Sequence, residues 1–277
     1  MSGRVLAWFS CGAASAVTAK LVVEEYGDRA EVLYCDTFAY EHPDNHRFFD
    51  DVQSWLGVPI KILRSEKYSD IYDVFERTRF LKGPHGARCT TELKKSVRHA
   101  YQEADDIHAL GYTVDEPGRV AQFKRENPEV FTDFPLVRHG IDKRETLRRL
   151  VAAKIELPAM YALGYKNNNC IGCVKGGIGY WNKIRQDFPD AFNRMAAMER
   201  KLDHALLRQE TGTRGTEGHR AEAVFLDELP PNIGRYEAEP DIECGVMCSP
   251  GTPVQGLLFP EATSRLQQDF PEVVRTA

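Results

Sequence analysis

Residues 4–24 read RVLAWFSCGAASAVTAKLVVE, and this stretch decides the fold. Its apolar run at 5–9 is typical of a buried parallel strand, and apolar residues recur at helical spacing from Val17 onward. The small residues at 10–15 predict a tight loop between strand and helix. Such a loop directs backbone N–H groups and the positive end of a helix dipole at one point, which suits a phosphate or sulfate group. Small residues also occur where a helix packs closely on its strand, so this alternative stays open.

The composition is that of a globular protein with an ample core. The chain has 277 residues, of which 42% are hydrophobic and 28% are charged. No apolar run approaches the roughly 20 residues that span a bilayer, so no membrane partner is expected. The chain starts directly with a strand and without a signal sequence, which favours a cytoplasmic location. The net charge of −5 argues against nucleic-acid binding over the whole surface, although it leaves room for a local basic groove.

Strand and helix patterns alternate over the first half of the chain. The periodicity predicts further strands at 31–36, 59–63, 107–112 and 135–137, and helices at 43–56, 70–80, 90–101, 117–125 and 142–154. This order predicts an α/β fold, an open and mostly parallel sheet flanked by helices. Such sheets bind ligands at the carboxyl ends of their strands. The chemistry is therefore expected at 10–15, at Asp36 and Thr37, and in the loop after Tyr112.

The composition changes from residue 162 onward. Residues 164–179 are rich in glycine and asparagine, and 180–209 predict one or two helices broken near Pro189. Sheet-forming sequence is expected to have ended. A polar connector follows at 211–220, and a last helix is expected at 262–270. These changes predict an α/β domain at 1–160 with a helical and irregular, cysteine-containing extension at 161–277 packed on it.

The cysteines form the sharpest constellation in the sequence. Cys170 and Cys173 make a C-x-x-C pair, Cys89 lies at the start of a predicted helix, and Cys244 and Cys248 lie near the end. In a reducing compartment such cysteines favour metal or redox chemistry over structural disulfides. Two thiolates separated by two residues can bind one metal ion. The spacing leaves four interpretations open: a zinc site, an iron-sulfur cluster, a redox dithiol, or unrelated buried thiols.

Four stretches together indicate a family. They are FSCGAASAV at 9–17, YCDTFAYEHPDN at 34–45, GYTVDEPGR at 111–119, and RCTTELKK at 88–95 with LGYKNNNCIGC at 163–173. In this order they resemble the phosphoadenosine phosphosulfate (PAPS) reductase family, within the adenine-nucleotide alpha-hydrolase superfamily. The resemblance runs through about residues 4–185. It implies that 1–160 is a nucleotide-binding domain of the adenine-nucleotide alpha-hydrolase type.

The resemblance also implies a site. The residues that it assigns to an adenine nucleotide or its anionic end are Ser10, Gly12, Ser15, Asp36, Thr37, Lys94, Asp115, Glu116 and Arg119. The alternative for Asp115 and Arg119 is a local ion pair on a helix, and for Lys94 a solvated face. The basic residues Lys143, Arg144, Arg148 and Arg149 are either ordinary surface or a guide for a polyanion.

The cysteine motifs imply a 4Fe-4S cluster, with zinc as the alternative. The cluster ligands would be Cys89, Cys170, Cys173 and Cys248. ECGVMC resembles the Glu-Cys-Gly tail of the reductases, which makes Cys244 the nucleophile, although the histidine that usually follows is missing. Whether Cys244 or Cys248 completes the four ligands stays open. A structural role for the metal stays open too.

Departures from the family pattern leave the reaction undecided. Pyrophosphatases of the superfamily carry Ser-Gly-Gly-x-Asp-Ser, whereas this chain has Cys11 at the first glycine and Ala14 at the acid. The iron-sulfur reductases have two adjacent cysteines where this chain has Arg88 and Cys89. The missing acid favours a sulfonucleotide reductase that uses a thiol reductant such as thioredoxin. The single Cys89 favours a nucleotide-dependent sulfurtransferase that thiolates a nucleic acid or small molecule. A non-catalytic nucleotide-binding protein and a homodimer also stay open.

Overall fold

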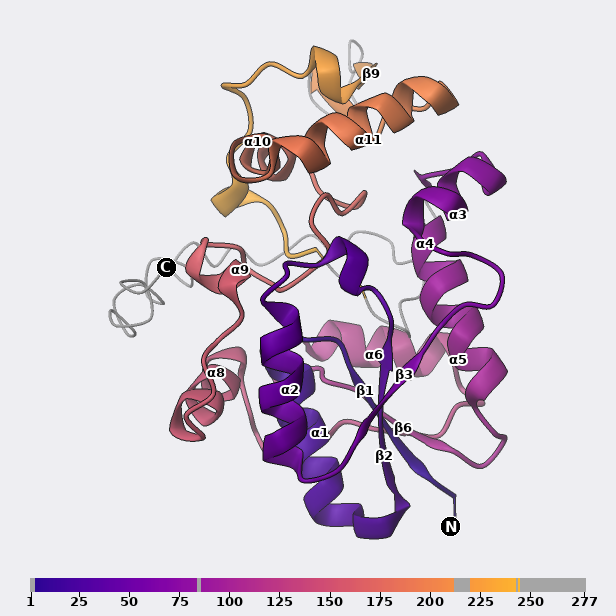
Figure 1. Cartoon of the computed structure of the whole chain (residues 1–277), viewed down its shortest axis with the longest axis vertical. Coiled ribbons are helices and arrows are strands. Elements are labelled where there is room, and N and C mark those ends of the chain that lie inside the picture. Colours follow the sequence, from indigo (N-terminus) through magenta and orange to yellow (C-terminus); the bar gives the residue numbers. More distant parts are fainter. Residues whose placement is uncertain (1–2, 84–85, 212–219, 243, 245–277) are drawn as a thin grey trace.

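A five-stranded parallel sheet forms the centre of the computed structural model, which describes residues 3–83, 86–211, 220–242 and 244 (Figure 1). The strand order is β3-β2-β1-β6-β7, and every pairing within it is parallel. The strands are β1 Val5–Phe9, β2 Ala30–Cys35, β3 Ile60–Leu63, β6 Ile107–Ala109 and β7 Thr132–Asp133. The predicted α/β class with an open parallel sheet is confirmed.

The central strand β1 is buried on both faces. Val5, Ala7 and Phe9 pack in one hydrophobic cluster, while Leu6 and Trp8 pack in another. The first cluster contains residues of α1 (Ala13–Tyr26), α2 (Asn45–Leu56) and α8 (Lys143–Ala152), and the second contains residues of α5 (Ser96–Tyr101) and α6 (Pro117–Glu126). Helices therefore cover both faces, and side chains alternate between them as the period of a strand requires.

Two helices in the same half of the chain, α4 (Arg88–Thr90) and α7 (Pro135–Arg138), differ from the sequence predictions. The segment predicted as a strand at 135–137 is the short helix α7, and the strand β7 ends just before it. Pro135 occupies the first turn of this helix, where its missing N–H costs nothing. The helix predicted at 90–101 starts earlier, as α4, and passes through a π turn at Thr91–Lys95 into α5.

The helix α3 (Ile71–Thr78) belongs to a third hydrophobic cluster, shared with the C-terminal half. That half contains α9 (Ala159–Ala162), α10 (Ile178–Asp187) and α11 (Pro189–Leu202), followed by the hairpin β8 (Leu207–Thr211) and β9 (Arg220–Val224) and the short turns Leu226–Glu228 and Tyr236–Ala238. Figure 1 shows α10, α11 and β9 grouped at the end of the molecule away from the N-terminus. Trp181 is fully buried in this cluster.

The C-terminal half corrects a second prediction. The helix break near Pro189 is confirmed, but the helical prediction over 180–209 is wrong beyond Leu202. The helix ends there because Asp203 adopts the left-handed conformation, with φ of 51°. The expectation that sheet-forming sequence had ended is also wrong, since β8 and β9 pair antiparallel. The helix expected at 262–270 lies outside the described residues.

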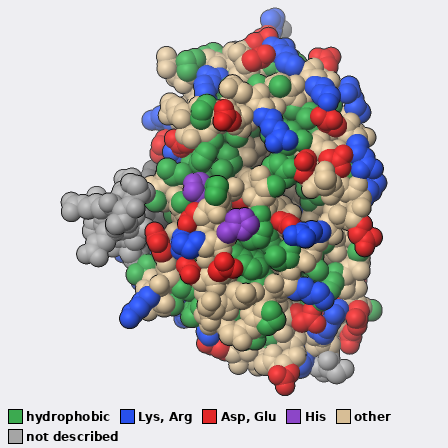
Figure 2. All heavy atoms as spheres, in the orientation of Figure 1, with side chains coloured by type: hydrophobic (Ala, Val, Ile, Leu, Met, Phe, Trp, Pro, Cys, Tyr) green, Lys and Arg blue, Asp and Glu red, His purple; other side chains and the backbone are tan. Residues whose placement is uncertain are grey.

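The surface carries charges of both signs. Figure 2 shows Lys and Arg side chains interspersed with Asp and Glu over the visible face. Among the helices that the structure describes, none is long and apolar enough to span a membrane.

Candidate functional site

The loop after β1 has its own internal hydrogen bonds. The Ser15 hydroxyl accepts from the Ser10 N–H (3.1 Å) and donates to the Gly12 carbonyl (2.9 Å), and the two serine hydroxyls lie 3.2 Å apart. Ser15 is buried and Ser10 is exposed. Gly12 is the N-cap residue of α1 and offers no side chain to the first N–H groups of the helix. Ser15 thus shapes the loop, Ser10 is exposed, and the Ala13 N–H at the start of α1 donates to the Tyr161 hydroxyl (3.4 Å).

Cys11 is a residue that the sequence analysis did not assign to the site. It is fully buried, and its φ of 53° lies in the left-handed region that favours glycine. Its carbonyl accepts a hydrogen bond of 2.6 Å from Asn168 Nδ2. Burial raises the pKa of the Cys11 thiol, so the group stays neutral. Its position beside a phosphate-type loop was the signal available in the sequence.

Asp36 and Thr37 lie at the carboxyl end of β2, as predicted. Asp36 Oδ2 accepts from Arg64 Nε (2.7 Å), which lies at the end of the neighbouring strand. Thr37 is buried, and its hydroxyl donates to Glu41 Oε1 (2.5 Å). Asp36 therefore stays near the surface, whereas the Thr37 hydroxyl is committed to a neighbouring carboxylate.

Glu41 is a second residue that the sequence analysis missed. Its carboxylate is buried and accepts hydrogen bonds from the hydroxyls of Tyr34 (2.9 Å) and Thr37 and from Asn45 Nδ2 (2.7 Å). These three donors supply the hydrogen bonds that a buried carboxyl group needs. Only its place in the loop after a strand end could have signalled this in the sequence.

The Asp-Glu-x-x-Arg residues lie in the loop after β6 and at the start of α6. Arg119 pairs with Glu116, and its guanidinium lies 4.4 Å from the centroid of the Tyr112 ring. Asp115 Oδ2 accepts from the Lys143 backbone N–H (2.9 Å). Arg119 is thus in a local ion pair, but its partner is Glu116 and not Asp115, and these contacts fix the loop at the carboxyl edge of the sheet.

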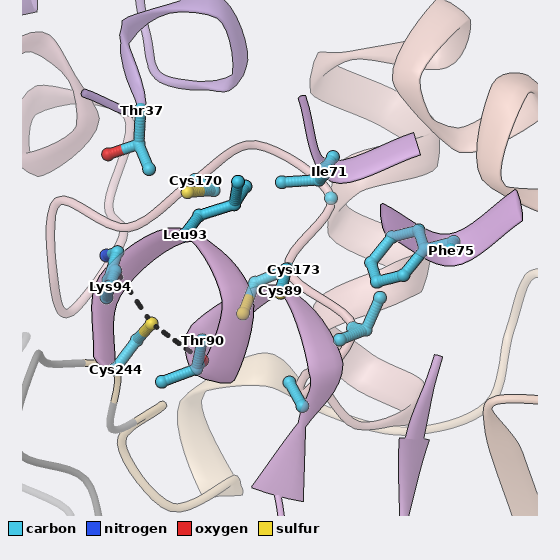
Figure 3. Close-up of a pocket in the computed structure, with 13 residues that line it drawn as sticks. Thr37, Ile71, Phe75, Cys89, Thr90, Leu93, Lys94, Cys170, Cys173 and Cys244 are labelled. Atoms are coloured by element: carbon cyan, nitrogen blue, oxygen red, sulfur yellow. Dashed lines mark hydrogen bonds between the residues drawn. The ribbon is translucent and has the colours of Figure 1, made fainter. Parts of the chain in front are cut away.

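The cysteines from three separate segments converge. Cys89 comes from α4, Cys170 and Cys173 from the loop before α10, and Cys244 from the end of the described chain. All four line one small cavity (Figure 3). A second small cavity is lined by Cys170, Cys173 and Cys244 together with Ser10. The thiols therefore lie next to the loop that was predicted to bind an anion.

The C-x-x-C segment is a tight turn braced by a tyrosine. Gly172 has a φ of 75°, a conformation that side-chain-bearing residues rarely adopt. The Tyr180 hydroxyl accepts from the Cys173 N–H (2.9 Å) and donates to the Cys170 carbonyl (3.1 Å). Gly172 therefore permits the tight turn between the two cysteines, and one buried side chain fixes the backbone of both.

Lys94 faces the thiols. Its Nζ lies 3.6 Å from Cys244 Sγ, and Thr90 Oγ1 lies at the same distance from that sulfur. Figure 3 shows both side chains directed at Cys244 from the helix that also carries Cys89. Lys94 lines both cavities, so the alternative of a solvated face does not describe it. The π turn at Thr91–Lys95 includes this lysine, and π turns are frequent at functional sites.

The thiols differ in their ionisation. Burial raises the pKa of Cys89 to about 12 and that of Cys173 to about 11, and it raises the pKa of Cys170 as well. Burial also opposes ionisation of Cys244, but the charges of Lys94 and Lys175 and hydrogen bonds from Thr90 and Lys94 lower its pKa below the ordinary value. Among the four thiols at the cavity, Cys244 is the one whose surroundings favour the thiolate, which is the nucleophilic form of cysteine.

The cavity offers thiols as potential metal ligands. The six cysteines that the structure describes are free. Among the described residues, no group of three or more His, Cys, Asp or Glu side chains stands at the spacing of a metal site. Thiolates are nevertheless the ligands of iron-sulfur clusters and of structural zinc. Cys89, Cys170 and Cys173 are the described thiols at the cavity that could serve as ligands of either group. Cys248 lies outside the described residues.

A strap, residues 236–242, precedes Cys244 and is fastened to the rest of the chain. Asn169 Nδ2 donates to the Ile242 carbonyl (3.0 Å), and Lys143 Nζ pairs with Asp241 (2.9 Å). Nearer its start, the strap places a carboxylate, that of Glu239, on the N–H groups at the start of α10. These contacts hold Cys244 at the cavity.

The predicted basic cluster is largely paired with acids. Arg148 and Arg149 both pair with Glu145, and Lys143 pairs with Asp241. Such pairing weakens a cluster as a guide for a polyanion, because its positive charge is partly compensated.

No protein-family model matches the chain, and the comparison with curated proteins gave no significant match.

Proposed function

We propose that this protein is an enzyme of the PAPS reductase type that acts on a sulfonucleotide, with Cys244 as its nucleophile. One observation carries the proposal. Cys244, a thiol with a lowered pKa, lies 3.6 Å from Lys94 Nζ, in a cavity that extends to Ser10 at the end of β1. A thiolate, a cation and an anion-binding loop are the groups that sulfuryl transfer to cysteine requires.

The backbone of the loop after β1 supports the nucleotide part of the proposal. Pyrophosphatases of the superfamily carry glycine at the position of Cys11, and Cys11 holds the left-handed conformation that glycine adopts most readily. The loop also lies at the carboxyl end of the central strand, where open parallel sheets bind their ligands. We therefore assign the anionic end of an adenine nucleotide to this loop and its adenosine to Asp36, at the end of β2, and Glu116, at the start of α6.

The reaction follows from these groups. The Cys244 thiolate attacks the sulfur of the sulfonucleotide, an S–S bond forms, and the S–O bond to the nucleoside phosphate breaks. The electron pair of that bond leaves with the phosphate. An external thiol of the thioredoxin class then attacks Cys244 Sγ, and sulfite departs with the electron pair of the S–S bond. A second thiol of the reductant regenerates Cys244. Lys94 stabilises the negative charge on the nucleophile and on the sulfonate.

The remaining cysteines fit a resident metal group. Cys89, Cys170 and Cys173 would hold a 4Fe-4S cluster, with Cys248 as the fourth ligand, and zinc is the alternative. When bound, such a group would add charge beside the cavity and join the segments that carry its ligands. With Cys248 as ligand, Cys244 stays available as nucleophile.

A second candidate function is nucleotide-dependent sulfur transfer. Three thiols of raised pKa share the cavity, and a cluster with three protein ligands would leave one iron open for sulfur. A nucleic-acid acceptor receives less support, because the basic cluster at Lys143 and its neighbours is paired with acids.

The test uses the full chain, purified without oxygen and loaded with iron and sulfide. We expect sulfite release from a sulfonucleotide in the presence of thioredoxin, and its loss in Cys244→Ser. The matched control is Cys35→Ala, which alters a buried thiol of β2 outside the cavity lining and should retain activity. If the wild type releases no sulfite, the reductase proposal fails. Release of AMP or pyrophosphate stimulated by RNA would instead support sulfur transfer.

A further inference from the structure

Asn168 joins the anion-binding loop to the segment that carries the C-x-x-C pair. Its Nδ2 donates to the Cys11 carbonyl (2.6 Å) and to Asn45 Oδ1 (2.8 Å). Both partners are acceptors, so the orientation of the Asn168 amide is determined. The side chain is 6% exposed, and its Oδ1 has no partner among the described residues. Asn168 therefore holds Cys11 in its left-handed conformation from the thiol side of the site.

The partner of Asn168 is itself fixed to the sheet. Asn45 is completely buried, and its Nδ2 donates to Glu41 Oε2 (2.7 Å). Glu41 is held in turn by Tyr34, which belongs to β2, and by Thr37 at its end. A buried network with charge-assisted bonds is stiff. Asn168 is consequently a fixed point relative to the strand ends.

Asn169, the next residue, contacts the segment that leads to the proposed nucleophile. Its Nδ2 donates to the Ile242 carbonyl (3.0 Å), two residues before Cys244. Asn168 and Asn169 both line the cavity that contains Ser10, Lys94 and the sulfur groups. Neighbouring Cα atoms are about 3.8 Å apart, so a single peptide unit separates the support of the anion loop from the support of the nucleophile.

We propose that Asn168 and Asn169 are positioning residues that set the separation between the anion-binding loop and Cys244. Asn168 fixes the loop through Cys11, and Asn169 fixes the strap through Ile242. The chemistry that this separation serves rests on the proposed function. Nucleophilic attack needs reacting atoms about 3–3.5 Å apart, and a displacement of about 1 Å can cost about 100-fold in rate. The asparagines thereby select ligands whose anionic group and sulfur span this distance.

The test is a pair of variants that we expect to loosen different segments. The two readouts are hydrogen–deuterium exchange and binding of adenosine 5′-phosphosulfate. In Asn168→Ala we expect exchange at 10–15 to accelerate and the Kd to rise, each about tenfold, with the strap unchanged. In Asn169→Ala we expect exchange at 236–242 to accelerate about tenfold with the Kd unchanged. Asn193→Ala, at an exposed position of α11, should change neither.

Selective loosening is the decisive outcome, because a merely structural role would accelerate exchange throughout the chain in both variants. Uniform acceleration, or exchange equal to that of Asn193→Ala, overturns the proposal. If Asn168→Ala does not fold, the Asn169→Ala result decides, since Asn169 is partly exposed. Sulfite release by the wild type is measured separately. Its absence would refute the proposed function while the exchange pattern still tests the positioning.

Discussion

The anion-binding loop and the thiol cavity are built in contrasting ways. The loop occupies one continuous stretch between β1 and α1, and its serines bond to each other within that stretch. The cavity draws Cys89, the C-x-x-C pair and Cys244 from segments far apart in the sequence. The loop therefore combines local hydrogen bonds with one long-range contact from Asn168, whereas the cavity depends on long-range contacts throughout. Substitutions that affect one part and spare the other can test this difference.

The largest effect is expected from Lys94→Met. Without the cation, burial dominates and the pKa of Cys244 rises, so the thiolate fraction at pH 7 falls. We expect alkylation of Cys244 by iodoacetamide at pH 7 to slow at least about tenfold. Because the rate rises with pH as the thiol ionises, the whole pH profile should move to higher pH. Nucleotide binding at the loop should change less than the thiol reactivity.

The control for this variant is Lys95→Met, at the neighbouring position of the same π turn. It should leave the pH profile of Cys244 where the wild type has it. The pH profile is measured by mass spectrometry of the alkylated peptide. An unchanged profile in Lys94→Met would show that Lys94 does not lower the pKa of Cys244.

An intermediate effect is expected from Gly172→Ala. The new Cβ would lie 3.4 Å from the Trp181 ring, at a φ of 75°. Left-handed backbone costs a non-glycine residue about 1–2 kcal/mol, so we expect a loss of about that size in the free energy of unfolding. The C-x-x-C turn should shift, and metal content after loading should fall. Gly118→Ala is the control, because a Cβ there meets nothing within 4 Å.

Denaturant unfolding monitored by tryptophan fluorescence, with metal analysis of the same samples, measures both consequences. Equal stability and metal content in the Gly172 and Gly118 variants would show that the turn does not depend on its glycine.

The smallest effect is expected from Ser15→Ala in the loop. It removes the hydroxyl that accepts from the Ser10 N–H and donates to the Gly12 carbonyl. Two local hydrogen bonds together contribute about 1–3 kcal/mol to the stability of the folded loop. We expect a loss near the lower end of this range because the loop borders solvent. Adenosine 5′-phosphosulfate binding should weaken, while the alkylation rate of Cys244 stays unchanged. Titration calorimetry and alkylation measure the two, and a slowed alkylation would contradict the separation of loop and cavity.

Local patterns predicted the parts of the fold that local chemistry determines. The apolar run of β1, the helix after it and the glycine turn between Cys170 and Cys173 follow from periodicity and backbone preference. These patterns did not predict the short strand β7, because Pro135 starts a helix directly after it. The hairpin of β8 and β9 was missed because Asp203 ends α11 without a glycine or proline to signal the end.

The site was predictable in its residue types and less so in its contacts. The sequence pointed to the cysteines that share the cavity, and the strand ends at Ser10 and Asp36. It did not reveal that Thr37 is committed to Glu41 or that Asn168 reaches the Cys11 carbonyl. Those contacts join residues whose separation in the sequence carries no periodic signal, so they exist only in the folded chain.

The central claim, that Cys244 is the nucleophile, is tested most directly by trapping its covalent intermediate. The full chain is incubated with adenosine 5′-phosphosulfate without a reductant, digested, and examined by mass spectrometry. The account predicts one added SO₃ group on the peptide that contains Cys244, its release as sulfite by reduced thioredoxin, and its absence in Lys94→Met at neutral pH. No adduct, or an adduct on Cys89, Cys170 or Cys173 in place of Cys244, would contradict the account.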